Sequence, residues 1–265
     1  MAEKRSSSEI TSSFGKNWID YVKRVSESDI AIAMQGITEW LGKDGVRGRR
    51  VIDVGSGSGI NSLSFCRLGA KSVHSFDYDP FSVEATKKLH AKEGGANWTI
   101  EQGSVLDTQY LLGLGKFDVV YAWGVLHHTG AMWDAINNCI GLVAPGGTMW
   151  IALYVKGPRY PKDVILKKKF NAASAFGKRI MIGQKILRKM ASQVKHGKNP
   201  FAWNHSVNRG MNVYYDIIDW LGGLPYETAN EDEVVRFLRE RGLVLERIKV
   251  TREGDLNQYV FSRPV

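Results

Sequence analysis

The stretch VIDVGSGSG, residues 51–59, decides the fold of this chain. An apolar run that includes Asp53 is followed by three glycines at alternating positions, Gly55, Gly57 and Gly59, and then by helix-forming sequence. Glycine lets the backbone turn sharply after a strand and lets a ligand approach where a side chain would block it. The N–H groups that open the next helix would face a polar or anionic part of that ligand. The stretch therefore predicts a strand, a cofactor loop and a helix.

The spacing of these glycines is GxGxG, whereas the dinucleotide-binding fingerprint is GxGxxG. A nicotinamide-dependent dehydrogenase is the alternative for such a loop. The GxGxG spacing, together with Pro145-Gly146-Gly147 further along the chain, argues against it.

Downstream of this stretch, strand and helix patterns alternate. Apolar runs predict five strands, at 51–54, 72–79, 98–107, 117–123 and 148–155, with helices at 61–68, 80–94, around Leu111 and 132–143. This alternation predicts a doubly wound, Rossmann-like α/β sheet with right-handed crossovers. After a helix at 231–242, runs at 241–250 and 257–265 have no helix between them, so they should form an antiparallel terminal hairpin and complete a seven-stranded sheet.

Three parts of the chain follow from this pattern. Residues 1–50 hold two amphipathic helices, at 12–25 and 30–41, that form an N-terminal lid. Residues 51–265 form the main domain, with a helical insertion or cap at 155–229. The polar N-terminus has no apolar core for a signal peptide and no run reaches membrane-spanning length, so we expect a cytoplasmic protein. Cys66 and Cys139 give neither a disulfide framework nor a metal spacing.

The basic character of the protein belongs to one segment. Residues 156–198 contain 13 Lys and Arg and one acidic residue, a balance of +12, whereas the whole chain carries +9. The apolar spacing there predicts two amphipathic helices, interrupted near Gly177 or Gly183. One interpretation is a solvated lysine face over an apolar stripe that packs on the domain. The other is an anionic partner, either RNA or a membrane surface.

These features together resemble the class I S-adenosylmethionine-dependent methyltransferases. The resemblance rests on the GxGxG loop behind an acid, an acid ending the second strand, the PGG before the fifth strand and the terminal hairpin. The segments FGKNW, WGVLHHTGAMW and DWLGGLPYE resemble a bacterial type that acts on small molecules or in glycan pathways. The resemblance implies S-adenosylmethionine as the cofactor.

The resemblance also implies a role for each cofactor-site residue. Gly55 and Gly57 would lie against the methionine moiety, Asp53 would face its ammonium group, and Asp77 would accept hydrogen bonds from the ribose hydroxyls. Helix capping is the alternative for either carboxylate. In the family an acid often binds the adenine amine where Ser104 stands here. The full expected set is Asp53, Gly55, Gly57, Gly59, Asp77, Tyr78, Ser104, Val105, Trp123 and Gly124.

Methyl transfer to a hydroxyl also needs a proton acceptor, and His128 or His127, just after the fourth strand, fits that role. We prefer His128, and the alternative is a structural histidine bonded to backbone. For the acceptor pocket we expect Tyr154, His205, Arg209, Tyr215, Asp219 and Trp220. The alternative is that these side chains form a polar-capped core within the insertion itself. Phe14, Lys16 and Trp18 would fold over the cofactor as a lid, and the alternative is a packed N-terminal helix. No cluster has metal-ligand spacing, so no metal is expected.

The leading functional hypothesis is methylation of a hydroxyl on a small-molecule or glycan-type acceptor, either neutral or carrying an anionic group such as phosphate. The alternatives are an N-methyltransferase of a small molecule, an RNA methyltransferase that uses the basic insertion, and a membrane-surface binding module. RNA is less favoured because the basic segment lacks a stacking platform. Peripheral membrane contact stays open, with Lys167, Lys168 and Lys169 as the expected contact residues.

Overall fold

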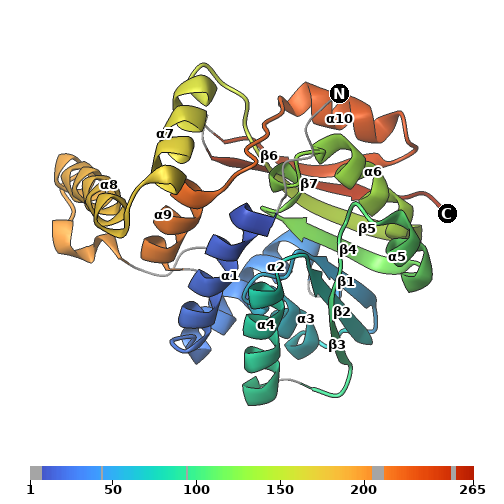
Figure 1. Ribbon diagram of the computed structural model, residues 1–265. Helices are drawn as coiled ribbons and strands as arrows, with labels where there is room; N and C mark the ends of the chain where they lie inside the picture. The colour runs from blue at the N-terminus through green and yellow to red at the C-terminus, as the bar shows by residue number, and fades with distance from the viewer. Residues whose placement is uncertain (1–7, 43, 94, 205–211, 252–254) are drawn as a thin grey trace.

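A computed structural model of the chain describes residues 8–42, 44–93, 95–204, 212–251 and 255–265 (Figure 1). For residues 8–14 it describes the backbone only. Seven strands form one sheet: β1 (Arg50–Val54), β2 (Ser72–Asp77), β3 (Trp98–Gln102), β4 (Phe117–Trp123), β5 (Val143–Tyr154), β6 (Val244–Lys249) and β7 (Leu256–Ser262).

The strand order is β3-β2-β1-β4-β5-β7-β6. Strands β1 to β5 are parallel, and β7 runs antiparallel between β5 and β6. The predicted doubly wound sheet with an antiparallel terminal hairpin is confirmed. In such a sheet the order reverses between β1 and β4, and ligands bind outside the carboxyl ends of the strands at that point.

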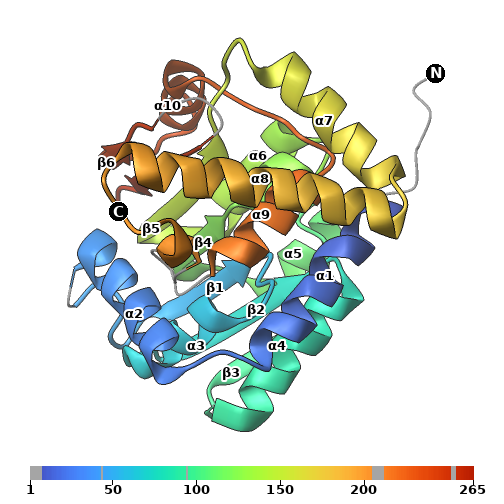
Figure 2. The same ribbon diagram turned by 90° about the vertical axis from the view of Figure 1, so that its left-hand side faces the viewer.

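Helices cover both faces of the sheet (Figures 1 and 2). The helices are α1 (Ser8–Val22), α2 (Glu27–Leu41), α3 (Ile60–Arg67), α4 (Pro80–Glu93), α5 (Thr108–Leu114), α6 (Met132–Leu142), α7 (Tyr160–Ala172), α8 (Ala175–Lys195), α9 (Val213–Gly222) and α10 (Glu231–Arg239), with short 3₁₀ turns η1 (Leu126–His128) and η2 (Pro200–Trp203).

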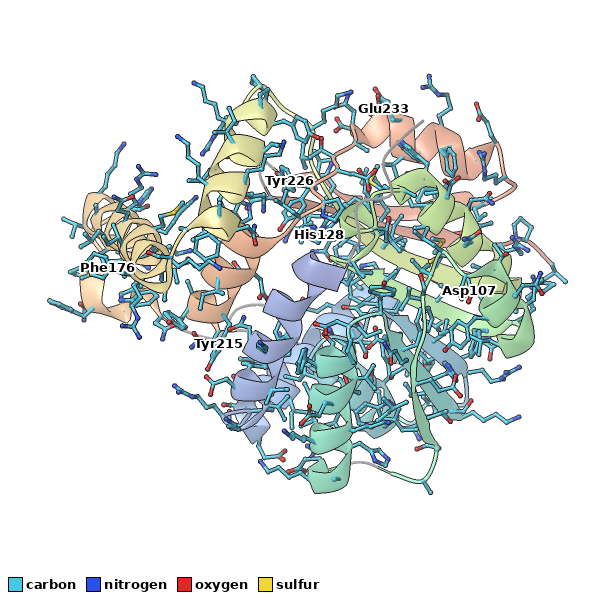
Figure 3. All side chains as sticks on the ribbon, viewed as in Figure 1. Asp107, His128, Phe176, Tyr215, Tyr226 and Glu233 are labelled. Atoms are coloured by element: carbon cyan, nitrogen blue, oxygen red, sulfur yellow. The ribbon has the colours of Figure 1, made fainter. Side chains whose placement is uncertain are left out.

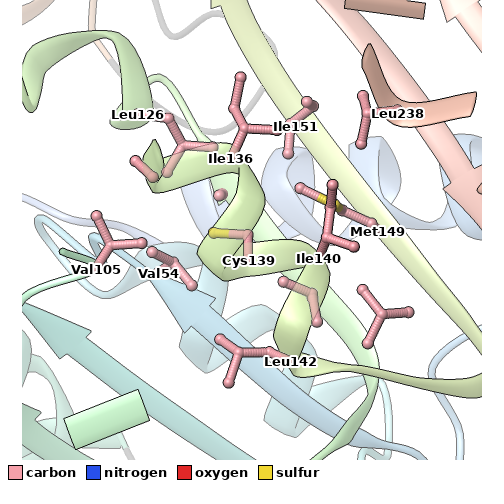
Figure 4. Close-up of a cluster of buried hydrophobic side chains, with 14 of the residues drawn as sticks. Val54, Val105, Leu126, Ile136, Cys139, Ile140, Leu142, Met149, Ile151 and Leu238 are labelled. Atoms are coloured by element: carbon pink, nitrogen blue, oxygen red, sulfur yellow. The ribbon is translucent and has the colours of Figure 1, made fainter. Parts of the chain in front are cut away.

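Two hydrophobic cores result, one on each face. Ile52 and Val54 of β1 belong to the core under α5, α6 and α10, part of which Figure 4 shows. Val51 belongs to the other core, which α2, α3 and α4 cover. Successive side chains of a strand point to opposite faces, so β1 contributes to both cores and is buried on both sides.

The PGG motif lies inside β5 rather than before it, which corrects the predicted start of that strand. Phe117 pairs with Val143 and Val119 pairs with Thr148, so the residues between them form an irregular bulge. Gly146 there has a φ of 70°, and its N–H donates to the carbonyl of Arg263 next to β7. The motif is thus a bend in a strand, which glycine permits.

The basic segment forms α7 and α8, and the break between them lies at Ala173 and Ser174 rather than at Gly177 or Gly183. The Ser174 hydroxyl accepts a hydrogen bond from the Gly177 N–H and caps α8. A serine cap decides where this helix starts, because an isolated glycine inside a helix costs only about 1 kcal/mol. Likewise α2 begins at Glu27, before the predicted residue 30, because Ser26 and Asp29 form a capping box.

The helices α1 and α2 precede the sheet, and α7 to α9 lie between β5 and α10 (Figure 1). The division into a lid, a main domain and an insertion stays a prediction. In the part of the chain that the structure describes, we find no helix with both the length and the apolar character needed to cross a bilayer.

Candidate active site

A cavity of about 250 Å³ opens at the carboxyl ends of the parallel strands. Its floor is made by the segments that follow β1, β2, β3 and β4. Trp18 and Tyr21 of α1 line it from one side, and Asp219 and Trp220 of α9 line it from another. The cavity therefore lies where the sheet, the N-terminal helix and the insertion meet.

The glycine loop after β1 adopts backbone conformations that favour glycine. Gly55, Gly57 and Gly59 have φ values of 73°, 56° and 81°. A β-carbon on Gly55 would lie 2.3 Å from Val125, and one on Gly57 would lie 3.1 Å from the indole nitrogen of Trp18. Gly55 and Gly57 line the cavity, whereas Gly59 packs against Thr86 and is not among the lining residues. A side chain on Gly55 would clash with Val125, and one on Gly57 would crowd the Trp18 ring.

Asp77 lines the cavity at the tip of β2. Its Oδ2 accepts a hydrogen bond from the Gly57 N–H at 3.0 Å, and its Oδ1 accepts one from the Asp79 N–H at 3.0 Å. Burial raises its pKa to about 6. The residue that caps α4 is Asp79, which accepts from the Phe81 N–H at 3.0 Å. The carboxylate of Asp77 therefore ties the glycine loop to the cavity edge, and capping does not account for it.

Asp53 does not line the cavity, contrary to the expected contact with a ligand ammonium group. Its side chain is on the same face of β1 as that of Val51, and Oδ2 accepts from the Ser62 hydroxyl of α3 at 2.5 Å. Ser75 donates to Ser62 at 2.7 Å, and Trp98 donates to Ser75 at 2.7 Å. Burial raises the pKa of Asp53 to about 7. Asp53 is the end of a buried hydrogen-bond chain beneath the loop.

The remaining expected cofactor-site residues surround the same cavity. Tyr78 is exposed beside Asp77, and Val105 is buried. The Ser104 hydroxyl accepts from the Leu106 N–H at 3.1 Å, so it orders its own turn. The lining set includes Tyr78, Ser104, Val105, Trp123 and Gly124.

The two neighbouring histidines are placed differently by η1. His128 lines the cavity, and its Nδ1 lies 2.6 Å from the carbonyl oxygen of Pro225. A carbonyl only accepts, so Nδ1 carries the proton, and Nε2 of the neutral ring has a lone pair. Burial lowers the pKa of His128 to about 3, which keeps the ring neutral near pH 7. Gly223, where a β-carbon would lie 2.7 Å from Cε1 of this ring, allows the end of α9 to approach it.

His127 is fully buried and does not line the cavity. Neither of its ring nitrogens has a hydrogen-bond partner among the described residues. The ring packs on Tyr154 and His128, with centroids 4.2 and 4.4 Å away. Burial lowers its pKa well below the usual value. Of the two histidines, only His128 is placed to reach a ligand.

Of the six residues expected in an acceptor pocket, Tyr154, Asp219 and Trp220 line the cavity. Tyr215 does not, because its hydroxyl donates to Asp20 of α1 at 2.7 Å. Figure 3 labels Tyr215, His128 and Tyr226, and the rings of His128 and Tyr226 both pack on Tyr154. His205 and Arg209 lie outside the described residues.

The N-terminal helix closes over this region. The Gly15 N–H donates to Asp79 Oδ2 at 2.8 Å, and Trp18 lines the cavity. Lys16 lies over the ring of Phe81, 5.4 Å from its centroid. The side chain of Phe14 is outside the described part of the structure.

Lys167 is a residue that the sequence reasoning missed, because it was counted with the solvated lysines. Its side chain is fully buried, and its ammonium group donates to the carbonyl of Trp220. It lies 4.4 Å from the ring centroid of Tyr226 and 4.5 Å from that of Trp220. Burial lowers its pKa to about 7. The spacing of Asp163, Lys167 and Phe170, which form the buried face of α7, is the pattern that would have revealed it.

Other residues of the cavity wall were also not expected. They are Tyr21, Val54, Ser56, Ser58, Ile60, Asn61, Phe76, Asp79, Ser82, Gly103, Leu106, Val125, Thr129, Leu224 and Leu256. Asp216, which belongs to the inserted segment expected to build the acceptor pocket, also lines the cavity. Within the described residues, the wall holds four aspartates and no lysine or arginine. A search of those residues for three or more His, Cys, Asp or Glu side chains able to hold a metal ion finds none.

Comparison with known families finds a match to the Methyltransferase domain family over residues 52–149. The ubiquinone biosynthesis O-methyltransferase of Colwellia psychrerythraea is 30% identical over 207 residues, which cover 70% of this chain and 78% of that protein. The protein of the same name from Vibrio parahaemolyticus is 34% identical over 109 residues, which cover 41% of this chain and 45% of the relative. With several relatives of this name the match spans about half of their length.

Solved structures share the fold. The magnesium protoporphyrin IX methyltransferase of Synechocystis PCC 6803, solved with bound SAH, gives a TM-score of 0.58 at 17% identity over 97% of both chains. An O-methyltransferase family protein from Burkholderia thailandensis gives 0.55 at 18% identity, over 93% of this chain and 58% of the other.

Proposed function

Because this chain belongs to the class I S-adenosylmethionine-dependent methyltransferases, we propose that it methylates a hydroxyl group of a small-molecule acceptor. Its cofactor is S-adenosylmethionine. The observation that carries the hydroxyl assignment is a neutral histidine, His128, at the cavity wall with its Nδ1 proton held by the Pro225 carbonyl. The O-methyltransferase names of the relatives support the same assignment.

The residues around the cavity suit this cofactor. Gly55 and Gly57 line the cavity without side chains, and Asp77 has a carboxylate at the cavity edge that suits two ribose hydroxyls. Tyr78 and Val105 would border the adenine, and Trp123 and Gly124 would border the methionine end. Asp53 would act only through Ser62, by holding α3 against the loop.

When bound, S-adenosylmethionine supplies an electrophilic methyl group on a sulfonium. The chain's own residues must hold the acceptor oxygen about 3 Å from that methyl, in line with the leaving sulfur. The oxygen would bond to the methyl carbon while the carbon–sulfur bond breaks and its electron pair leaves with the sulfur. His128 Nε2 would accept the proton that the oxygen loses. The proton on Nδ1 remains hydrogen-bonded to the Pro225 carbonyl oxygen. This bond fixes the tautomer in which Nε2 can accept a proton.

The acceptor end of the cavity favours an uncharged, ring-bearing molecule. Tyr154 and Trp220 offer aromatic surface, and Leu224 and Leu256 offer apolar surface. The aspartates of the wall oppose an anionic group next to the reacting hydroxyl. We therefore propose a glycan-type or aromatic hydroxyl acceptor whose anionic part, where it has one, stays outside the cavity.

The experiment has two arms. Calorimetry with S-adenosylhomocysteine, the demethylated cofactor, should show binding, and its absence would overturn the cofactor assignment. Incubation with methyl-¹³C-labelled cofactor and a panel of phenols, sugars, amines and RNA, followed by NMR of the products, should give an O–CH₃ resonance. An N–CH₃ product would establish the N-methyltransferase alternative, and label in RNA would establish the RNA alternative.

A further inference from the structure

The helix α8 has two apolar faces. On the inner face, Met181, Ile182 and Ile186 are half-buried toward the body of the protein, and the Lys185 ammonium lies 3.7 Å from the ring centroid of Trp220. No residue of α8 is fully buried. Figure 2 shows α8 lying across the face of the molecule turned to the viewer, with α9 behind it.

The outer face carries large apolar side chains in solvent. Phe176, Ile180, Leu187 and Val194 are exposed by 73%, 47%, 65% and 60%. Their spacings of four and seven residues place them within about 40° of one line along the helix. Phe201 of η2, which packs against α8, is also 80% exposed. Figure 3 shows Phe176 at the outer edge of the molecule. Soluble domains rarely leave such an apolar stripe in water.

The charges beside this stripe are all positive. The helix α8 contains six Lys and Arg and no Asp or Glu. Helical geometry places Arg179 on one side of the stripe and Arg188 and Lys195 on the other. An apolar line between two basic borders matches an anionic bilayer, whose acyl boundary accepts the apolar side chains while its headgroups pair with the cations.

We propose that the outer face of α8 docks on an anionic lipid surface, with Phe176, Ile180, Leu187 and Val194 at the acyl boundary. A second copy of the chain fits this face poorly, because a two-fold contact would bring the basic borders together. RNA does not account for the apolar stripe. The expected contact through Lys167, Lys168 and Lys169 is replaced, because Lys167 is buried and α8 supplies the surface.

The test is co-sedimentation of the full chain with vesicles of phosphatidylcholine, with or without phosphatidylglycerol. The wild-type chain should bind only the anionic vesicles, and added salt should weaken binding. The double substitution Phe176→Ser/Leu187→Ser should lower the bound fraction about tenfold or more, because two side chains lose their apolar burial. The matched control is Leu112→Ser in α5, where the side chain is 74% exposed and separate from α8. It should bind like wild type.

A second pair of variants tests the charges. Arg188→Gln/Lys195→Gln should weaken binding to anionic vesicles, whereas Lys87→Gln/Lys249→Gln, exposed on α4 and β6, should not. Equal binding by the stripe variant and wild type, or equal binding to neutral vesicles, would overturn the proposal. So would a dimer in light scattering that the stripe variant abolishes, or RNA binding without lipid binding. Calorimetry with S-adenosylhomocysteine on every variant keeps the outcome separate from that of the proposed activity.

Discussion

The side-chain amide of Asn17 donates a hydrogen bond to Asp219 Oδ1 at 2.8 Å, and so joins the N-terminal helix α1 to α9 of the insertion. Asn17 and Asp219 are 202 positions apart in the sequence, and they are in contact beside the cavity that Asp219 lines. On one side of this contact Gly15 is bonded to Asp79, and on the other Tyr215 is bonded to Asp20. The helix α1 is therefore held both to the segment after β2 and to α9.

Asn17→Ala should weaken the contact between α1 and α9 beside the cavity. Loss of one hydrogen bond of about 1 kcal/mol predicts that S-adenosylhomocysteine dissociates roughly fivefold faster. Stopped-flow displacement with a fluorescent analogue measures the rate. Gln35→Ala is the control, since it removes an exposed bond to Glu39 within α2. An unchanged rate in Asn17→Ala would show that α1 does not retain the ligand.

The affinity for S-adenosylhomocysteine should fall as pH drops below about 6. The folded-state pKa of Asp77 is raised to about 6, and ribose hydroxyls bind its ionised form, so below that pH binding must first remove a proton. The fall approaches tenfold per pH unit. Asp77→Asn should bind about 10 to 100-fold more weakly at pH 8 and lose most of the pH dependence.

Calorimetry across pH 5 to 8 is the measurement. Asp118→Asn is a suitable control, because Asp118 accepts from the Arg50 N–H at the opposite end of the strands. Retention of the full pH dependence in Asp77→Asn would place the titrating group elsewhere.

Gly55→Ala should lower the free energy of unfolding by about 2 kcal/mol or more. Gly55 has a positive φ, which strains an alanine, and the added β-carbon would clash with Val125. Gly113→Ala in α5 is the opposite case, since a β-carbon there meets nothing within 4 Å. It should be neutral or stabilise by up to about 1 kcal/mol. Urea unfolding of both variants compares them, and equal effects would contradict the described loop.

His128→Asn should lower kcat about 100-fold or more on an acceptor found in the product screen. The asparagine amide can still donate to the Pro225 carbonyl, but no basic nitrogen remains. Since the pKa of His128 is lowered to about 3, the ring should impose no acidic limb on kcat/KM between pH 5 and 8. The affinity for S-adenosylhomocysteine should change less than twofold. His90→Asn on α4 is the control, and a normal kcat in His128→Asn would remove His128 from the mechanism.

Lys167→Met should change how stability depends on pH. The pKa of Lys167 is about 7 in the folded protein against 10.5 in a model peptide, so between these values the unfolded chain binds more protons. The free energy of unfolding should therefore rise with pH over that range, by about 2 to 4 kcal/mol. Lys167→Met should flatten this rise, whereas Lys168→Met, at an exposed position, should keep it. Urea unfolding at pH 7 and pH 10 provides the test.

Local patterns were enough to predict the sheet and the position of its binding edge. Strand–helix alternation predicts a doubly wound parallel sheet, because crossovers have one hand, and two final strands without a helix between them predict an antiparallel hairpin. The pairing order β3-β2-β1-β4-β5-β7-β6 is known only from the structure. The cofactor loop followed from glycine spacing, since φ above zero is a property of the backbone itself. The role of Asp77 was implied by the family resemblance, which includes an acid at the end of the second strand.

Side-chain direction was harder to predict. Asp53 precedes the same loop, yet strand alternation sends its carboxyl toward Ser62 and away from the cavity. His127 and His128 are adjacent in sequence, but the turn η1 buries one and places the other at the wall. The boundary between α7 and α8 depended on the Ser174 cap, which outweighs the glycines beside it.

The sequence by itself determined the architecture and the cofactor loop, because hydrophobic period, glycine placement and capping act over a few neighbouring residues. Only the tertiary structure decided that Lys167 is buried under aromatic rings while Leu187, twenty residues on, faces solvent. Both lie on amphipathic basic helices, and their spacing looks alike. Their burial depends on which face of each helix α9 covers, and that is set by contacts between segments distant in the chain.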